Sequence, residues 1–272
     1  MLLTQCITSA RPLLLVGCGR MGTALARAWL RQGLEARALH IVEPAGRPPI
    51  DEPFAHHAQI AEVPQDVRPR ALVIAVKPQK ITAVLEEVPR FAAAGPLLLS
   101  IAAGVTLKRL TAAVPSAVRA MPNTPAAIGQ GITAAVAAPE THAEDRDLAA
   151  ALMAATGDFL WLDDEALLDI VTAVSGSGPA YVYALTEAMA YAGKAQGLPM
   201  AIAERLARKT VIGAAALMAE SGVPAAVLRE QVTSPGGTTA AALEILRGED
   251  GLEALMTKAV ATATRRSREL DG

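Results

Sequence analysis

Apolar residues in the first part of the chain fall into short, continuous runs separated by longer mixed segments. The runs cover residues 13–16, 39–42, 71–76, 96–101, 117–120 and 133–137, and residues 159–162 could add a last one. Runs of this length are typical of strands that are covered on both faces. Helical patterns at 21–32, 81–88, 107–113 and 145–156 lie between them. This alternation predicts an α/β architecture with a doubly wound parallel sheet.

After Asp163 the strand-like runs stop. Residues 165–174, 179–196, 200–221, 224–231, 239–247 and 252–270 all carry helical patterns. Clusters of Gly, Ser and Pro separate them and serve as caps and stops. We therefore expect two domains, an α/β domain at 1–163 and an all-α domain at 164–272.

The helical half carries a surplus of apolar surface. Residues 211–219, for example, are apolar almost all round the helix. Such a helix must be buried on all sides, which is hard to achieve within so short a segment. This favours a homodimer that forms through the C-terminal helices, and an unusually well-filled monomeric bundle is the alternative.

Composition narrows the class of protein. Hydrophobic residues make up 52% of the 272 residues and charged residues 19%, and the formal net charge is −2. A nearly neutral chain gives no electrostatic reason to expect nucleic acid or an anionic membrane as partner. The longest uncharged stretches, 91–107 and 120–139, contain glycine, proline and polar residues that a lipid-facing helix would not carry together.

Secretion and metal binding find no support in the sequence either. Residues 1–10 lack the basic start of a secretory signal. Cys6 and Cys18 are the only cysteines, so we expect no disulfide framework and a reduced, cytoplasmic setting. The histidines and cysteines show no metal-ligand spacing, and we expect no metal.

The loop after the first predicted strand fits the pattern G-x-G-x-x-G at residues 17–22 and opens a predicted helix. Gly17 would allow the tight turn, Gly19 would let the backbone approach a pyrophosphate, and Gly22 would let helix and strand pack closely. The N–H groups of Arg20 and Met21 would face the phosphates. This context predicts dinucleotide binding, with an ordinary tight turn as the alternative.

Glu43 stands about twenty residues further on, at the end of the second predicted strand. A carboxylate there would accept hydrogen bonds from the ribose diol of NAD and repel the extra phosphate of NADP. Arg47 could instead pair with that phosphate, and Glu43 could be a solvated turn residue before Pro44. We expect NAD(P)H as the cofactor, with NADH favoured by Glu43.

Further loops should lie at the carboxyl ends of the strands, where open α/β sheets bind ligands. Residues 75–79 carry a lysine that could reach the cofactor or substrate, residues 100–104 are small enough to admit a flat nicotinamide ring, and 121–125 form a proline-bracketed loop. The predicted cofactor-binding residues of these loops are Ala75, Val76, Lys77, Pro78, Ala102, Ala103 and Asn123.

Two helix starts in the second half carry unusual sequences. Residues 175–179 read Ser-Gly-Ser-Gly-Pro, which a simple cap and hinge largely explains. Residues 232–239 read Val-Thr-Ser-Pro-Gly-Gly-Thr-Thr and would present N–H groups, a positive dipole end and hydroxyls to one point. We expect the second segment to bind a carboxylate.

Missing motifs also bear on the chemistry. The sequence contains no G-x-S-x-G, no Walker lysine and no histidine in a candidate loop that could act as general acid. A dehydrogenase that acts on an alcohol usually needs a proton acceptor, whereas an imine can arrive already protonated. The absence fits imine reduction.

Taken together, residues 14–22, 75–79, 121–125, 175–181 and 232–239 closely resemble the motifs of the pyrroline-5-carboxylate reductases, in the same order and spacing. The resemblance implies a Rossmann-like domain followed by a helical dimerisation domain, with dimers sometimes assembled into a ring. It implies reduction of 1-pyrroline-5-carboxylate to L-proline, at a site between the cofactor domain and helices of the dimer. Cys18 departs from the alanine more common in the family, and Glu43 departs from the Ser, Arg or Thr of NADP-preferring members.

The resemblance also assigns roles at the substrate site. Ser234 and the N–H groups of Gly237 and Thr238 would hold the substrate carboxylate. The Thr239 hydroxyl would face the ring nitrogen and could help to protonate it, and Thr172 would border the pocket. Thr239 and Ser234 are therefore the predicted catalytic residues.

Two other functions fit parts of the sequence. A hydroxy-acid or keto-acid dehydrogenase on the same plan would place a lysine on an early helix of the second domain, but Lys194 lies near the end of its predicted helix. A non-catalytic dinucleotide sensor would bind the cofactor without turnover, and would leave the hydroxyl-rich second site without a purpose.

Overall fold

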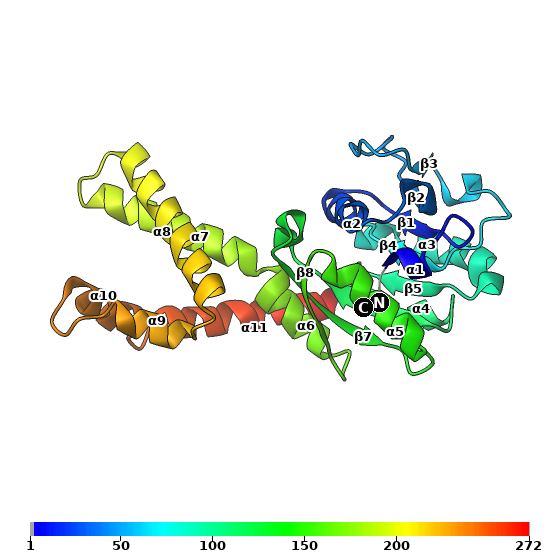
Figure 1. The fold of residues 1–272 in the computed structure, drawn as a ribbon. Helices are drawn as coiled ribbons and strands as arrows, with labels where there is room; N and C mark the ends of the chain where they lie inside the picture. The colour runs from blue at the N-terminus through cyan, green and yellow to red at the C-terminus, as the bar shows by residue number, and fades with distance from the viewer. Residues whose placement is uncertain (1–2, 272) are drawn as a thin grey trace. The chain divides into compact units, whose positions relative to one another are not determined.

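The computed structural model describes residues 3–271 and falls into two compact units (Figure 1). The first unit holds the chain up to Ser177 together with its end from Ala263, and the second holds Gly178–Thr262. Residues 1, 2 and 272, which the predicted domains include, lie outside the described part. The domain boundary after Asp163 stays a prediction. The compact units divide later, after Ser177, because the helix at Leu167–Val171 packs on the sheet.

The first unit is built on one sheet, in which the described strands follow the order β3-β2-β1-β4-β5-β6-β7-β8. The sequence predicted every strand but β3, whose Ala-His-His carries no apolar run. The strands are β1 (Leu13–Val16), β2 (Leu39–Val42), β3 (Ala55–His57), β4 (Ala71–Ile74), β5 (Leu97–Ser100), β6 (Ala117–Met121), β7 (Gly131–Ala137) and β8 (Gly157–Trp161).

All described neighbours in the sheet are parallel except β6 and β7, which run antiparallel with Met121 opposite Ala134. The predicted doubly wound parallel sheet is thus confirmed except at this one pair. A parallel connection needs a crossover of about a dozen residues or more. The connection here is a short loop with a 3-10 turn at Thr124–Ile128, which only an antiparallel return allows.

Helices cover both faces of the sheet, so alternate residues of each strand enter different cores. Leu13 and Leu15 pack with Trp29 on one face, whereas Leu14 and Val16 join a separate cluster on the other. The helices of this unit are α1 (Leu3–Cys6), α2 (Arg20–Arg31), α3 (Ile81–Glu87), α4 (Leu107–Thr111), α5 (Ala143–Ala154) and α6 (Leu167–Val171), the last continued by a π-helical turn at Thr172–Gly176.

The second unit is helical, as predicted. It contains α7 (Gly178–Ala195), α8 (Met200–Ser221), α9 (Ala225–Gln231), α10 (Thr238–Leu246) and the first part of α11 (Leu252–Asp271). Among its described residues only Ala190, Ala203 and Ala207 are buried apolar side chains. In the described part of the chain no single helix is long and apolar enough to cross a membrane, and by length and composition alone only the bent pair α8 and α9 meets that test.

Candidate functional site

The glycine loop between β1 and α2 is packed too tightly for side chains at two positions. Gly17 has φ +90°, and a Cβ there would lie 2.8 Å from the Ala75 carbonyl oxygen. A Cβ on Gly22 would lie only 2.4 Å from the Gly17 carbonyl oxygen. These two glycines are therefore required by the approach of α2 and the Ala75 segment to the loop.

No steric contact in the described chain requires a glycine at position 19, because a Cβ there would meet no described atom within 4 Å. The residue is exposed and precedes α2, whose hydrogen-bond ladder starts with Thr23 N donating to Gly19 O at 2.9 Å. The N–H groups of Arg20 and Met21 precede this ladder and so point to the open end of the helix. An open backbone beside a helix N-terminus fits a dinucleotide pyrophosphate.

The same loop lines a cleft of about 490 Å³. The structure brings together here the predicted residues Gly17, Gly19, Glu43, Ala75, Val76 and Lys77. It adds Ala58, Gln59, Ile60, Lys80, Val84 and Glu87, which sequence reasoning missed. The first three follow the unrecognised strand β3, and the other three lie on the segment 80–87 next to Pro78. Seven other predicted cofactor-binding residues do not line this cleft, namely Arg20, Met21, Gly22, Pro78, Ala102, Ala103 and Asn123.

Glu43 is a fixed part of this cleft and not a solvated turn residue. Its carboxylate accepts hydrogen bonds from the backbone N–H groups of Cys18 (2.7 Å) and Ala45 (3.0 Å). Its own backbone N–H donates to the His57 carbonyl at 3.0 Å. The glycine loop and β3 together hold the carboxylate at the end of β2.

Arg47, the alternative partner for a cofactor phosphate, is engaged elsewhere. Its guanidinium lies 4.1 Å from the centre of the Phe54 ring and donates to the Phe54 carbonyl at 3.3 Å. Stacking and this hydrogen bond hold the Arg47 side chain on its own loop.

Cys18 is buried in the loop, and its Sγ lies 3.5 Å from the Thr23 hydroxyl. Burial raises the pKa of the Cys18 thiol, the Thr23 hydroxyl lowers it, and the charge of Glu43 raises it further. The thiol is therefore neutral at pH 7 and adds no negative charge beside the proposed pyrophosphate position.

Asn123 and Thr172, two further predicted residues of the first unit, lie on segments that meet near the end of β6. The Asn123 side chain accepts from Ile132 N (3.0 Å) and donates to the Ser175 carbonyl (3.2 Å). Thr172 Oγ1 donates to the Leu168 carbonyl at 2.7 Å, and a Cβ on Gly176 would lie 3.7 Å from the Thr172 Cγ2 and 4.0 Å from the Met121 Sδ. The loop after β6 and the π-helical turn are therefore joined.

The hydroxyl-rich loop before α10 belongs to the second unit. Gly236 has φ +71°, and a Cβ on Gly237 would lie 2.5 Å from Ser234 Oγ, so both glycines have a local reason. Gly237 N donates to Ser234 O at 3.0 Å, and the α10 ladder begins with Ala241 N donating to Gly237 O. The N–H groups of Thr238 and Thr239 precede that ladder, whereas the Gly237 N–H is already engaged.

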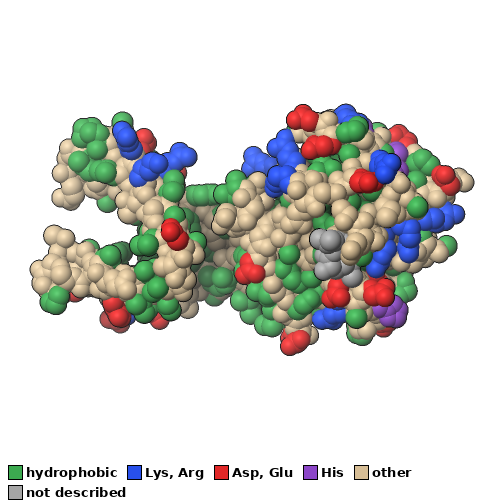
Figure 2. Space-filling view, in the orientation of Figure 1, with side chains coloured by type: hydrophobic (Ala, Val, Ile, Leu, Met, Phe, Trp, Pro, Cys, Tyr) green, Lys and Arg blue, Asp and Glu red, His purple; other side chains and the backbone are tan. Residues whose placement is uncertain are grey.

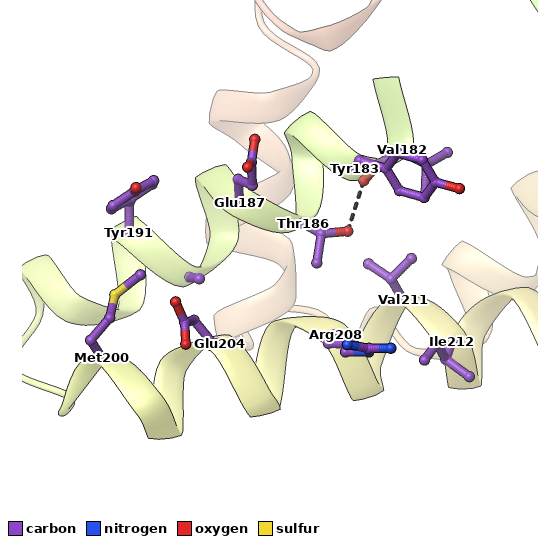
Figure 3. Close-up of a pocket in the computed structure, with 11 residues that line it drawn as sticks. Val182, Tyr183, Thr186, Glu187, Tyr191, Met200, Glu204, Arg208, Val211 and Ile212 are labelled. Carbon is purple, nitrogen blue, oxygen red and sulfur yellow. Dashed lines mark hydrogen bonds between the residues drawn. The ribbon is translucent and has the colours of Figure 1, made fainter. Parts of the chain in front are cut away.

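A groove of about 650 Å³ lies between α7 and α8 (Figure 3). Apolar side chains of both helices line it, and Glu187, Glu204 and Arg208 add charges. Hydrophobic side chains are also open to view on the helices in Figure 2. The large exposed ones of the second unit include Tyr183, Tyr191, Ile202, Leu206, Ile212, Leu217 and Ile245. Exposed apolar side chains in such numbers are typical of surfaces that contact another protein, a membrane or a ligand.

Comparison with protein families gives a match in each half of the chain. Residues 165–270 match the family described as pyrroline-5-carboxylate reductase dimerisation. Residues 13–104 match the family described as NADP oxidoreductase, coenzyme F420-dependent.

Relatives match the chain over most of its length. It is 38% identical over 260 residues to the pyrroline-5-carboxylate reductase of Pseudomonas aeruginosa, covering 94% of this chain and 95% of that protein. Its fold matches the reductase of Coxiella burnetii with a TM-score of 0.85 at 29% identity, covering 97% and 99% of the two chains. The pyrroline carboxylate reductase of Plasmodium falciparum, solved with NADP bound, matches with a TM-score of 0.80 at 26% identity, covering 97% and 100%. The chain belongs to the pyrroline-5-carboxylate reductase family.

Proposed function

We propose that the protein reduces 1-pyrroline-5-carboxylate to L-proline with NAD(P)H, the last step of proline biosynthesis. The observation that carries the proposal is family membership over 94% of the chain. The open glycine loop and the hydroxyl-rich start of α10 supply the two kinds of site that this reaction needs.

The first unit would hold the cofactor. Gly17, Gly19 and Gly22 would form the phosphate turn with the N–H groups of Arg20 and Met21, and Glu43 would accept from the adenosine ribose. A bound NAD(P)H supplies the hydride that reduces the C=N bond. The other residues proposed to contact it are Ala75, Val76, Lys77, Pro78, Ala102, Ala103 and Asn123.

The second unit would hold the substrate by its carboxylate. The proposed donors are the Ser234 hydroxyl and the N–H groups of Gly237 and Thr238. The Gly237 N–H already donates to Ser234 O, so it would have to donate to that oxygen and to the carboxylate at once. The Thr239 hydroxyl would face the imine nitrogen, and Thr172 would border the pocket. The work of these residues is chiefly orientation, which contributes about 7–11 kcal/mol in favourable cases.

Two substitutions test the substrate site. Thr239→Ala should lower kcat strongly, whereas Ser234→Ala should mainly raise KM for the imine, since the first residue meets the reacting nitrogen and the second the carboxylate. Thr257→Ala is the matched control, because its hydroxyl donates to the Glu253 carbonyl on the exposed face of α11. Normal kinetics in both site variants would contradict the assignment.

We also propose that NADH is preferred over NADPH. The Glu43 carboxylate cannot easily swing away from a 2′-phosphate, because Cys18 N and Ala45 N hold both of its oxygens. Arg47 stacks on Phe54 and donates to its carbonyl, so part of its hydrogen-bonding capacity is used on its own loop. Glu87 adds a second carboxylate to the cleft, while Lys77 and Lys80 attract the phosphates of either dinucleotide.

Loss of reduced-nicotinamide absorbance with pyrroline-5-carboxylate tests both proposals at once. The expected result is proline formation with a higher kcat/KM for NADH. Glu43→Ser should raise kcat/KM for NADPH by about tenfold relative to NADH, since about 1.4 kcal/mol of repulsion is removed. Turnover that favours NADPH in the native protein would refute the preference and leave the reaction intact.

The exposed apolar helices and the match to a dimerisation family support a homodimer through the C-terminal helices. A ring of dimers is a further proposal, and light scattering would give the number of chains in the particle. We also propose a cytoplasmic location, in line with a biosynthetic role.

A further inference from the structure

Both polar atoms of the Asn123 side-chain amide form hydrogen bonds within the first unit. Its Oδ1 accepts from Ile132 N at 3.0 Å, and its Nδ2 donates to Ser175 O at 3.2 Å. A backbone N–H can only donate and a carbonyl can only accept, so these partners fix which end of the amide faces which way. The residue is only 9% exposed, and its side chain joins the loop after β6 to the π-helical turn.

The Ser175 carbonyl needs this donor for a reason that lies in the sequence. Ser175 lies where the π-helical turn passes into α7. In the α-helical register its carbonyl would accept from the N–H four residues further along, and that residue is Pro179, which has no N–H. A carbonyl left unpaired in a half-buried position is destabilising, because it has lost water without gaining a donor. The Asn123 amide replaces the donor that Pro179 removes.

The carbonyl that Asn123 holds belongs to a turn with a special geometry. The turn spans Thr172–Gly176 and is closed by Ser177 N donating to Thr172 O at 2.8 Å. It carries Thr172, and it holds the last residues of the first unit before the chain enters the second. Single π-helical turns inside helices often occur at functional sites. A shift of the Ser175 carbonyl would change the turn that presents Thr172.

We propose that Asn123 is a positioning residue for the reduction, which acts by holding the Ser175 carbonyl and with it the π-helical turn. This inference rests on the proposed function. The positioning role and the cofactor contact proposed above for Asn123 differ in their effect on the Kd for NADH, which only the cofactor contact should change. Its partners are the Ile132 N–H and the Ser175 carbonyl, and its effect on catalysis passes through Thr172.

The first test is Asn123→Asp, which keeps the size of the side chain. One carboxylate oxygen still accepts from Ile132 N, whereas the other faces the Ser175 carbonyl and repels it. The expected result is a fall in kcat of about tenfold, with the Kd for NADH, measured by calorimetry, within about twofold of the native value. Amide hydrogen exchange should become faster in residues 172–177.

The second test is a rescue by Pro179→Ala, which gives residue 179 an N–H of its own. On its own this variant should keep native activity. Added to Asn123→Asp, it should raise kcat at least threefold above that of Asn123→Asp alone, because the Ser175 carbonyl then has a helical donor. A residue with a merely general structural role would not be rescued at this one position.

Several outcomes would overturn the proposal. An unchanged kcat in Asn123→Asp would do so, and so would a Kd for NADH that rises in step with the loss of kcat, because that is the mark of a cofactor ligand. Failure of Pro179→Ala to restore kcat would show that Asn123 does not act through the Ser175 carbonyl. If Asn123→Asp does not fold, Asn123→Ala with and without Pro179→Ala gives the same comparison without an added charge.

Failure of the proposed function would look different. A native protein that binds NADH but does not turn over pyrroline-5-carboxylate would contradict the reaction. Faster hydrogen exchange at residues 172–177 in Asn123→Asp, reversed by Pro179→Ala, would still show that Asn123 holds the π-helical turn through the Ser175 carbonyl.

Discussion

The two compact units use a similar apolar composition in opposite ways. In the first unit the strands β1, β4 and β5 are buried along their whole length, with helices on both faces of the sheet. In the second unit only three small alanines are buried among the described residues, whereas tyrosines, leucines and isoleucines are exposed. The first unit completes its core within one chain, and the second leaves its core unfinished.

This difference separates two origins of stability. Burial within one chain stabilises a unit at any concentration, whereas burial between chains depends on association. The helical unit should therefore owe its stability to the partner copy, and the sheet unit should not. The same exposed surface accounts for part of the high apolar content of the sequence.

Trp29 offers the largest expected effect on the first unit. It is fully buried, and its Nε1 donates to the Leu152 carbonyl at 2.7 Å. Trp29→Ala should cost about 3–5 kcal/mol of unfolding free energy, from the lost burial, the cavity and the orphaned carbonyl. Urea denaturation should show this loss at every protein concentration. Trp161→Ala, at a half-buried position on the edge strand, is the control and should cost much less.

Ile212 tests the second unit in the opposite way. It lies on α8 in the groove with α7 and is 50% exposed within one chain. Ile212→Asp should raise the dimer dissociation constant at least tenfold, since a charge would be buried against the partner, at a cost of about 1.4 kcal/mol or more. Light scattering over a dilution series measures this. Ala83→Asp, on an exposed turn of α3, should leave the dimer unchanged, and a dimer equally stable in both variants would refute the interface.

The fold was predictable where the chain is locally consistent. Apolar runs bounded β1 and β2 correctly, and α8 begins and ends at the predicted residues 200 and 221. Strand β3 was missed because its His56 and His57 belong to no apolar run. The antiparallel turn between β6 and β7 was missed because strand direction depends on the length of a connection, which the apolar pattern does not register.

The candidate site was predictable only in part, for a related reason. The glycine spacing located the tight loop before α2 and the place of Glu43 in the cleft, because both depend on short-range geometry. The lining residues Ala58, Gln59 and Ile60 depend on β3 and were lost with it. The hydrogen bond from Asn123 to Ser175 joins residues far apart in sequence, and no local pattern announces it.

The smallest expected effect is a pH dependence confined to the first unit. All four histidines lie there. His40 on β2 and His57 on β3 stack with ring centres 5.3 Å apart, and His40 Nδ1 lies 3.1 Å from His57 Nε2. Burial lowers the pKa of both residues, and the charge of His57 lowers that of His40 further. The pair is therefore neutral in the folded protein at pH 7.

A histidine whose folded pKa is depressed binds protons more readily in the unfolded state. The unfolding free energy should therefore decrease as the pH falls below the ordinary histidine value of 6.5, and level off below the folded pKa values. His40→Gln should flatten the curve, since it removes one titrating ring from the pair. Urea denaturation of the sheet unit between pH 8 and 5 gives the curve, and light scattering follows the dimer in the same samples. Because the helical unit holds no histidine, a dimer dissociation constant that changed in parallel with the sheet's stability would show that the two units are not energetically separate.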